Sequence, residues 1–246
     1  MATAARYSRA MELCDTHCHL TEEPLWSKLD AVLDRGRRAG IARIVVPSAG
    51  VESWPRVAEL GRTRSVHPAF GVHPWVVDEP FSADHLVELL RAERAVAVGE
   101  IGLDFALERF DRGRQIAVLE QQLAIAADLD LPVILHCRRA FDDLHTLLRP
   151  HVPRLRGVLH AFSRGSALAE QFAALGLHVA FGGAITRPTA RARQAATALP
   201  LERILLETDA PSIGLAGIAP EQVEPAHVAA IARQLADLRG VDIETV

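Results

Sequence analysis

Residues 14–20 read Cys-Asp-Thr-His-Cys-His-Leu and open the first apolar segment of the chain. Asp15, His17 and His19 occupy every second position of a predicted strand, so their side chains share one face. The two cysteines and the threonine between them fall on the other face. A strand that directs a carboxylate and two imidazoles to one side is either poorly suited to packing or part of a polar site.

Outward from this segment, short β-branched runs alternate with amphipathic helical patterns along the whole chain. Strands are predicted at 12–17, 43–47, 66–72, 96–101, 132–137, 157–162, 178–184 and 204–209. Helices are predicted at 26–39, 53–63, 82–93, 112–129, 141–148, 166–175, 189–198 and 225–238. Strict alternation predicts parallel strands joined by right-handed crossovers. Eight units in 246 residues predict an α/β fold, a single-domain (β/α)8 TIM barrel, with a doubly wound open sheet as the alternative.

The chain shows no internal domain boundary. We expect an N-terminal extension over residues 1–10 and one barrel domain over 11–246. Residues 241–246 read as an N-cap and first helical turn, so we expect a further C-terminal helix to be truncated.

Composition excludes several classes of protein. No apolar run approaches the roughly 18 residues of a membrane span, and the N-terminus lacks the apolar core of a secretory signal. Three cysteines without a C-x-x-C pair argue against a disulfide scaffold or a thiolate zinc site, so we expect a cytoplasmic location. Because the net charge is −4, any attraction to nucleic acid must come from a local group of residues and not from the charge of the whole chain.

Ionisable residues gather at the ends of the predicted strands, where parallel barrels carry out their chemistry. They are His17, His19, His73, Glu100, His136, His160 and Asp209. The remaining histidines lie at strand starts, on helices or in connections, where packing or surface roles are expected. Imidazoles and carboxylates crowded into one barrel mouth lose hydration and repel unless a cation lies among them. The pattern therefore predicts a metal centre.

The spacing of the histidines favours two ions. His17 and His19 share a face and can chelate one ion, while His136 and His160 come from adjacent strands and can hold a second. Nitrogen and carboxylate ligands without thiolate suit Zn²⁺, Mn²⁺, Mg²⁺ or Fe²⁺ and do not choose among them. Two ions about 3.5–4 Å apart can clamp the attacking and leaving oxygens of a displacement.

A pair of ions needs a bridging anion. Some metal barrels use a carbamylated lysine, but the only lysine of this chain is Lys28, on the first predicted helix. A carboxylate must therefore bridge, and Glu100 at the end of the fourth strand is placed for this task.

Seven segments in order resemble the TatD family of metal-dependent deoxyribonucleases, which are amidohydrolase-like barrels. They read DTHCHL, GVHP, VAVGEIGLDF, LPVILHCRRA, GVLHAFSRGS, VAFGGAIT and LPLERILLETDAP, and they cover nearly the whole chain from Met11 onwards. The HCRR and GGAIT forms are most similar to the bacterial YjjV-like branch. The resemblance implies a (β/α)8 barrel, two divalent metal ions per subunit and hydrolysis of DNA phosphodiester bonds.

The resemblance also implies roles for individual residues. Its metal ligands are His17, His19, Glu100, His136, His160 and Asp209. The first two histidines and Asp209 would bind one ion, the other two histidines the second, and Glu100 would bridge. His73 of the GVHP motif would contact the substrate phosphate. Phe105 stands where the family often has tyrosine, which leaves the ligands intact and puts substrate preference in doubt.

The expected mechanism is attack on phosphorus by a hydroxide that the two metals activate, with Asp209 as general base and Glu100 as the bridge. Arg138 and Arg164 follow two of the histidine ligands and are expected to bind substrate phosphate, although solvated positions at the rim are an equal alternative.

Three further carboxylates are expected to support the ligands without binding metal themselves. Asp15 and Glu207 share faces with His17 and Asp209, two residues deeper, and would orient ligands or pair with arginine. Asp104 would hydrogen-bond a ligand or a metal water, or cap a loop.

The sequence thus predicts a metal-dependent deoxyribonuclease, an exonuclease acting on DNA ends or single strands, with no membrane and no obligate protein partner. Two alternatives stay open. One is hydrolysis of a carboxylic ester, lactone or cyclic amide on the same barrel. The other is a non-catalytic metal-binding or scaffold protein.

Overall fold

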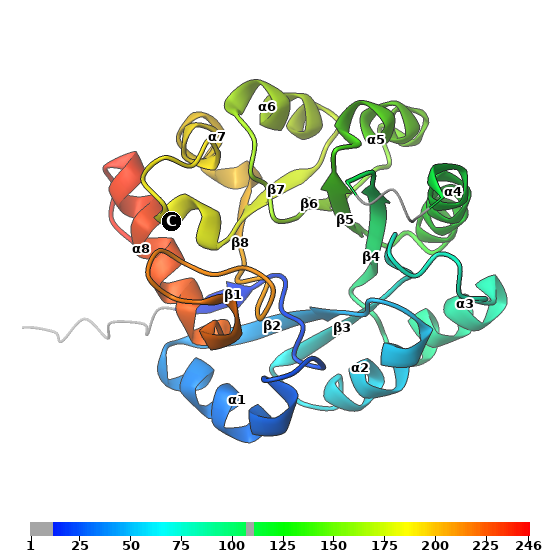
Figure 1. Cartoon of the computed structure of the whole chain (residues 1–246), viewed down its shortest axis with the longest axis horizontal. Helices are drawn as coiled ribbons and strands as arrows, with labels where there is room; N and C mark the ends of the chain where they lie inside the picture. The colour runs from blue at the N-terminus through cyan, green and yellow to red at the C-terminus, as the bar shows by residue number, and fades with distance from the viewer. Residues whose placement is uncertain (1–11, 107–110) are drawn as a thin grey trace, which may run out of the picture.

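A computed structural model describes residues 12–106 and 111–246, and it contains one parallel sheet whose eight strands follow the order of the chain (Figure 1). The strands are β1 (Leu13–Asp15), β2 (Ile41–Pro47), β3 (Val66–Phe70), β4 (Ala97–Asp104), β5 (Val133–Arg138), β6 (Gly157–Leu159), β7 (His178–Phe181) and β8 (Ile204–Leu206). The predicted TIM barrel is confirmed, because a doubly wound sheet would place later strands on both sides of the first.

The helices surround the strands (Figure 1). They are α1 (Leu29–Arg38), α2 (Trp54–Leu60), α3 (Ala83–Ala92), α4 (Arg112–Asp128), α5 (Phe141–Leu148), α6 (Ser166–Ala174), α7 (Ala192–Ala198) and α8 (Val228–Arg239). Side chains cap two of them at the N-terminus: Ser82 accepts from the His85 N–H, and Asp111 accepts from the Arg114 N–H. Within the described residues, no helix is both long and apolar enough to cross a bilayer.

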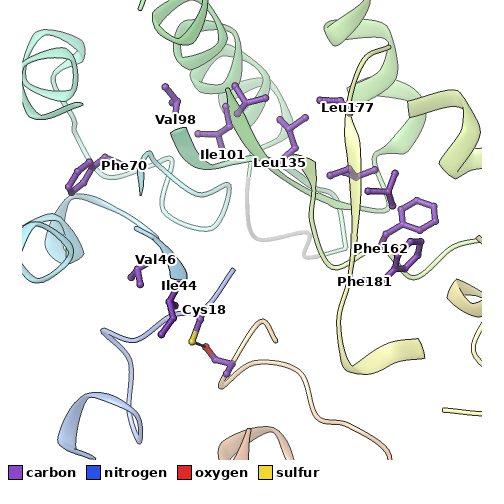
Figure 2. Packing of buried hydrophobic residues seen from close by; sticks show 14 of the residues in the cluster. Cys18, Ile44, Val46, Phe70, Val98, Ile101, Leu135, Phe162, Leu177 and Phe181 are labelled. Carbon is purple, nitrogen blue, oxygen red and sulfur yellow. Dashed lines mark hydrogen bonds between the residues drawn. The ribbon is translucent and has the colours of Figure 1, made fainter. Parts of the chain in front are cut away.

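The hydrophobic core has two parts because alternate strand residues face opposite ways. Ile44 and Val46 on β2 point towards the helices and belong to the larger cluster, part of which is drawn in Figure 2. Val45, between them, packs against the smaller cluster inside the barrel. That interior is built largely from small side chains: Ala69, Ala97, Ile134, Val158 and Ala180. The barrel is therefore filled below its mouth.

The barrel closes between β1 and β8, which are shorter than the predicted 12–17 and 204–209. Individual backbone bonds beyond the strand ends join them: Thr16 N to Leu206 O (3.0 Å), Asp209 N to His17 O (2.9 Å) and His19 N to Ala210 O (2.8 Å). Asp209 has a positive φ of 51°, so the chain leaves the extended conformation there. Regular strand geometry is given up where the polar side chains are presented.

The predicted N-terminal extension, residues 1–10, lies outside the described residues. At the other end, the N–H of Thr245 donates to the carbonyl of Asp242 (3.1 Å), which forms a turn after α8. The single-domain division and the further C-terminal helix stay predictions.

Candidate metal centre

The polar residues singled out in the sequence meet at the carboxyl ends of the strands. Glu100 is carried towards them by β4, which passes unusually close to β5. At Gly102 the φ angle is +146°, and an added Cβ would lie 2.0 Å from the carbonyl oxygen of His136. Only glycine fits this position. The strand pairing also shifts register between Val98 and Ile101, the two residues that flank the Gly99–Glu100 pair.

Glu100 joins two pairs of histidines through its two carboxylate oxygens. Oε2 lies 3.1 Å from His17 Nε2 and 3.5 Å from His19 Nε2. Oε1 lies 2.8 Å from His160 Nε2 and 3.0 Å from His136 Nδ1. The side chain is buried, and each oxygen serves a different pair. This is the arrangement that a bridging carboxylate requires.

The donor atoms within each pair also converge. His17 Nε2 and His19 Nε2 are 3.1 Å apart, and His160 Nε2 and His136 Nδ1 are 3.4 Å apart. Asp209 Oδ1 completes the first set at 3.4 Å from His19 Nε2. Imidazole nitrogens brought this close to one another and to carboxylates fit a shared divalent cation. The residues can therefore hold metal on both sides of Glu100.

The charges at the centre favour cations. Burial tends to raise the pKa of Glu100, but the surrounding imidazoles, His160 first, hold it well below its usual range. Burial lowers the pKa of His17 to about 4. For His19, burial also tends to lower the pKa, but the hydrogen bond to Asp209 and the charge of Glu100 raise it to about 9. Positive charge is thus stabilised on His19 beside the two carboxylates, whereas His17 keeps a neutral ring whose lone pair is free to bind a cation.

His73 differs from the four converging histidines in its hydrogen bonds. The backbone N–H of Trp75 donates to its Nδ1 (3.1 Å), and its Nε2 lies 3.2 Å from Glu100 Oε1. A neutral imidazole that accepts at Nδ1 carries its proton on Nε2. His73 therefore presents an N–H donor to the centre, whereas a metal ligand needs a lone pair.

The carboxylate of Asp104 accepts three hydrogen bonds and so supports His136. They come from His136 Nε2 (3.2 Å), Trp75 Nε1 (2.8 Å) and the Ala106 N–H (2.9 Å). Burial tends to raise the pKa of Asp104, but these donors lower it to about 2. With the proton of His136 drawn to Nε2, the lone pair on Nδ1 faces Glu100. Asp104 thereby fixes which nitrogen His136 offers.

Asp15 and Glu207 lie beneath the centre, and neither pairs with an arginine in the part of the chain that the structure describes. Asp15 accepts from Thr208 N (2.9 Å) and Thr208 Oγ1 (2.6 Å), which ties β1 to the segment after β8. Glu207 Oε1 accepts from the Ala161 N–H and lies 3.9 Å from His160 Nδ1. Burial raises the pKa of Asp15 to about 7 and that of Glu207 to about 8.

A cavity of about 580 Å³ opens above the centre. Only one of the two arginines that were predicted to bind phosphate lines this cavity. Arg138 lines it. Arg164 does not: its guanidinium lies 5.3 Å from the centroid of the Phe141 ring.

Trp75 and Arg187 are among the lining residues that sequence reasoning missed. Trp75 directly follows the GVHP motif, a signal that could have identified it. Arg187 is positioned by a bond from its Nη2 to Gly214 O (2.8 Å), a contact that no local pattern indicates.

A (β/α)8 barrel whose mouth gathers two imidazole pairs around one carboxylate defines a metal-dependent hydrolase architecture. The comparisons with known proteins give the family. The model of the TatD related DNase family matches residues 14–246, and the chain belongs to this family.

Two curated relatives and one solved structure illustrate the membership. The chain is 38% identical to the uncharacterized metal-dependent hydrolase YjjV of Escherichia coli, over 92% of this chain and 89% of that protein. It is 34% identical to the 3'-5' ssDNA/RNA exonuclease TatD of Erwinia amylovora, over 94% and 93%. The crystal structure of Escherichia coli YjjV matches with a TM-score of 0.87 at 37% identity, covering 95% of this chain and 92% of that chain.

Proposed function

We propose that this metal-dependent hydrolase cleaves DNA phosphodiester bonds as an exonuclease, with two divalent ions held on either side of Glu100. The observation that carries the proposal is the contact of each Glu100 oxygen with a different histidine pair. A relative described as a 3'-5' ssDNA/RNA exonuclease supports nucleic acid as the substrate class.

Each ion has its own ligands in this proposal. His17, His19 and Asp209 hold one ion, His136 and His160 hold the other, and Glu100 is shared. When bound, the two ions would lower the pKa of a water molecule and neutralise charge on the phosphate. The donor set accepts Zn²⁺, Mn²⁺ or Mg²⁺, so the ion is left to measurement.

The chain's own groups divide the remaining tasks of hydrolysis. Asp209 accepts the proton of the attacking water. Burial tends to raise its pKa, but the hydrogen bond to His19 and the charges of His160, His17 and His19 together hold it below the ordinary value. The Nε2–H of His73 donates to a phosphoryl oxygen, and Arg138 at the cavity wall pairs with the phosphate. The oxygen of the water bonds to phosphorus as the bond from phosphorus to the oxygen of the neighbouring nucleotide breaks. The proton held by Asp209 passes to that oxygen, so the nucleotide leaves as an alcohol.

The size of the cavity and the charge of the chain favour flexible DNA. About 580 Å³ lies within the range of pockets that take small ligands, which suits a strand end or a single strand. A net charge of −4 provides no broad attraction to duplex DNA.

The test is hydrolysis of single-stranded DNA in Mg²⁺, Mn²⁺ and Zn²⁺ by the parent chain and by the Glu100→Ala and Asp209→Asn variants. Loss of the general base or of the bridge is expected to lower kcat/KM by about 10²–10⁴-fold. Circular dichroism checks the fold, and Glu170→Ala, at an exposed site on α6, is the matched control. Full activity of either variant with saturating metal would refute the assignment.

A parallel screen separates the alternatives. Turnover of a lactone, carboxylic ester or cyclic amide without turnover of DNA would assign the same centre to acyl hydrolysis. Absence of any divalent-ion-dependent turnover would instead favour a metal-binding or scaffold role.

A further inference from the structure

Trp75 is an exposed aromatic residue at the wall of the catalytic cavity. Among the described residues, the large hydrophobic side chains that are exposed are Trp75 (44%), Val152 (41%) and Val241 (37%). Of these three, Trp75 alone lines the cavity. Tryptophan usually buries most of its large surface, so an exposed indole beside a polar centre points to contact with a ligand.

The indole is held in one orientation although it is exposed. Its Nε1–H donates to Asp104 Oδ2 at 2.8 Å, a bond that lies in the ring plane and therefore uses an edge of the ring. The ring stands nearly perpendicular to His73 (77°, centroids 4.8 Å apart) and to His136 (69°, 6.0 Å). A planar group that binds here meets a rigid platform directly beside the groups assigned to the phosphate.

We propose that Trp75 forms a stacking subsite for the nucleobase next to the scissile phosphate, an inference that rests on the proposed phosphodiesterase function. Aromatic side chains hold the bases of single strands by stacking, and they do so with little sequence preference because every base has a π-face. A neutral platform of this kind supplies affinity without positive charge, which a chain of net charge −4 otherwise lacks.

Trp75 also supports His136 through Asp104, so the test must separate stacking from positioning. The measurement is the ratio of kcat/KM for a single-stranded oligothymidylate to kcat/KM for the same strand with abasic tetrahydrofuran residues at two positions on each end. Loss of the Asp104 bond lowers both rates together and cancels in this ratio. Stacking acts on the strand that carries bases.

The parent chain is expected to prefer the base-bearing strand by about 5- to 150-fold, the range that alanine substitution reports for one stacked base. Trp75→Ala is expected to reduce the ratio to about 1. Trp75→Phe lacks the indole N–H but keeps a ring, so it is expected to retain most of the ratio. Trp26→Phe is the control, because Trp26 lies away from the cavity wall with Arg56 over its ring.

Nucleotide binding without metal gives a second readout. In the presence of EDTA, thymidine monophosphate is expected to quench the fluorescence of the parent chain and of Trp26→Phe. Deoxyribose 5-phosphate is not expected to do so, and Trp75→Phe is expected to lose the quenching. Absence of quenching in the parent chain, or equal quenching in Trp75→Phe, would overturn the subsite.

The kinetic outcomes also distinguish the two proposals. If Trp75→Ala lowers kcat/KM by the same factor on both strands, the ratio is unchanged. This result would overturn the stacking subsite while DNA hydrolysis stands. Failure of the parent chain to cleave either strand while it hydrolyses a lactone would overturn the proposed function, and the subsite with it, before any variant is made.

Discussion

Asp104→Asn offers a sharp test of the metal centre because it changes one atom of a buried side chain. The carboxylate oxygens of Asp104 accept three hydrogen bonds, from His136, Trp75 and the Ala106 backbone. An amide has one acceptor oxygen, and its NH₂ group must face an N–H donor in either orientation. In the orientation that keeps the Ala106 bond, the NH₂ group faces the Trp75 N–H and His136 Nε2 and draws the imidazole proton to Nδ1, the atom proposed to bind metal. In the other orientation it faces the Ala106 N–H, and His136 donates to a neutral amide oxygen in place of a carboxylate.

The magnitude follows from the number of ligands affected. His136 is one of two histidines on its side of Glu100, and loss of a carboxylate that orients a metal-binding histidine costs about 10- to 100-fold in metal affinity. This corresponds to about 1.4–2.7 kcal/mol. His17 and His19 do not contact Asp104, so the other ion is expected to bind with unchanged affinity.

The assay is calorimetric titration of metal-free protein with Zn²⁺ or Mn²⁺. Asp104→Asn is expected to weaken one binding step and leave the other. Asp128→Asn, an exposed aspartate at the end of α4, makes the same charge change away from the centre. Two steps within twofold of the parent chain would refute the role of Asp104, and equal weakening of both steps would refute the division of ligands around Glu100.

Two further predictions concern the closure of the barrel and the protons at the centre. Asp15→Ala leaves the buried N–H and hydroxyl of Thr208 without their acceptor, so we expect the free energy of unfolding to fall by about 2–6 kcal/mol. Urea unfolding measures this change, and a decrease below about 1 kcal/mol would contradict the role of Asp15. Metal affinity is expected to rise from pH 6 to pH 8. In the metal-free chain, burial tends to lower the pKa values of His19 and His160, but neighbouring carboxylates raise them to about 9 and about 10, so metal binding must release protons. Calorimetry in buffers of different ionisation enthalpy measures that release. A metal affinity that does not change with pH would contradict the assignment.

The barrel and the location of the site were predictable because both follow from periodicity. Alternation of strand and helix patterns indicated eight parallel strands, and residues such as Glu100 and His136 could be placed at the mouth from their position at strand ends alone. Because Lys28 is the only lysine and is on the first predicted helix, a carboxylate was predicted to bridge the two ions. The roles of these residues as ligands stay predictions, as do the cytoplasmic location and the absence of an obligate partner.

Contacts between distant segments could not be predicted from the sequence. Asp15 accepts hydrogen bonds from Thr208, which no sequence pattern indicated. Its neighbours Glu207 and Asp209 could be selected because they are charged. Arg138 and Arg164 follow their histidines by two and four positions, yet one lines the cavity and the other packs over Phe141. Side-chain direction beyond a strand end depends on turns such as the positive φ of Ala161 (48°), which no periodic pattern encodes.

The barrel closes through Asp15 and Thr208, which lie 193 positions apart, so the centre can form only late in the synthesis of the chain. During synthesis the segment with His17 and His19 leaves the ribosome among the first, and Asp209 only after all eight strands have been made. No nascent fragment that stops before β8 can assemble the full set of donors. In the proposed metal centre, the full set of donors can therefore act together only after the segment beyond β8 has been made and has docked.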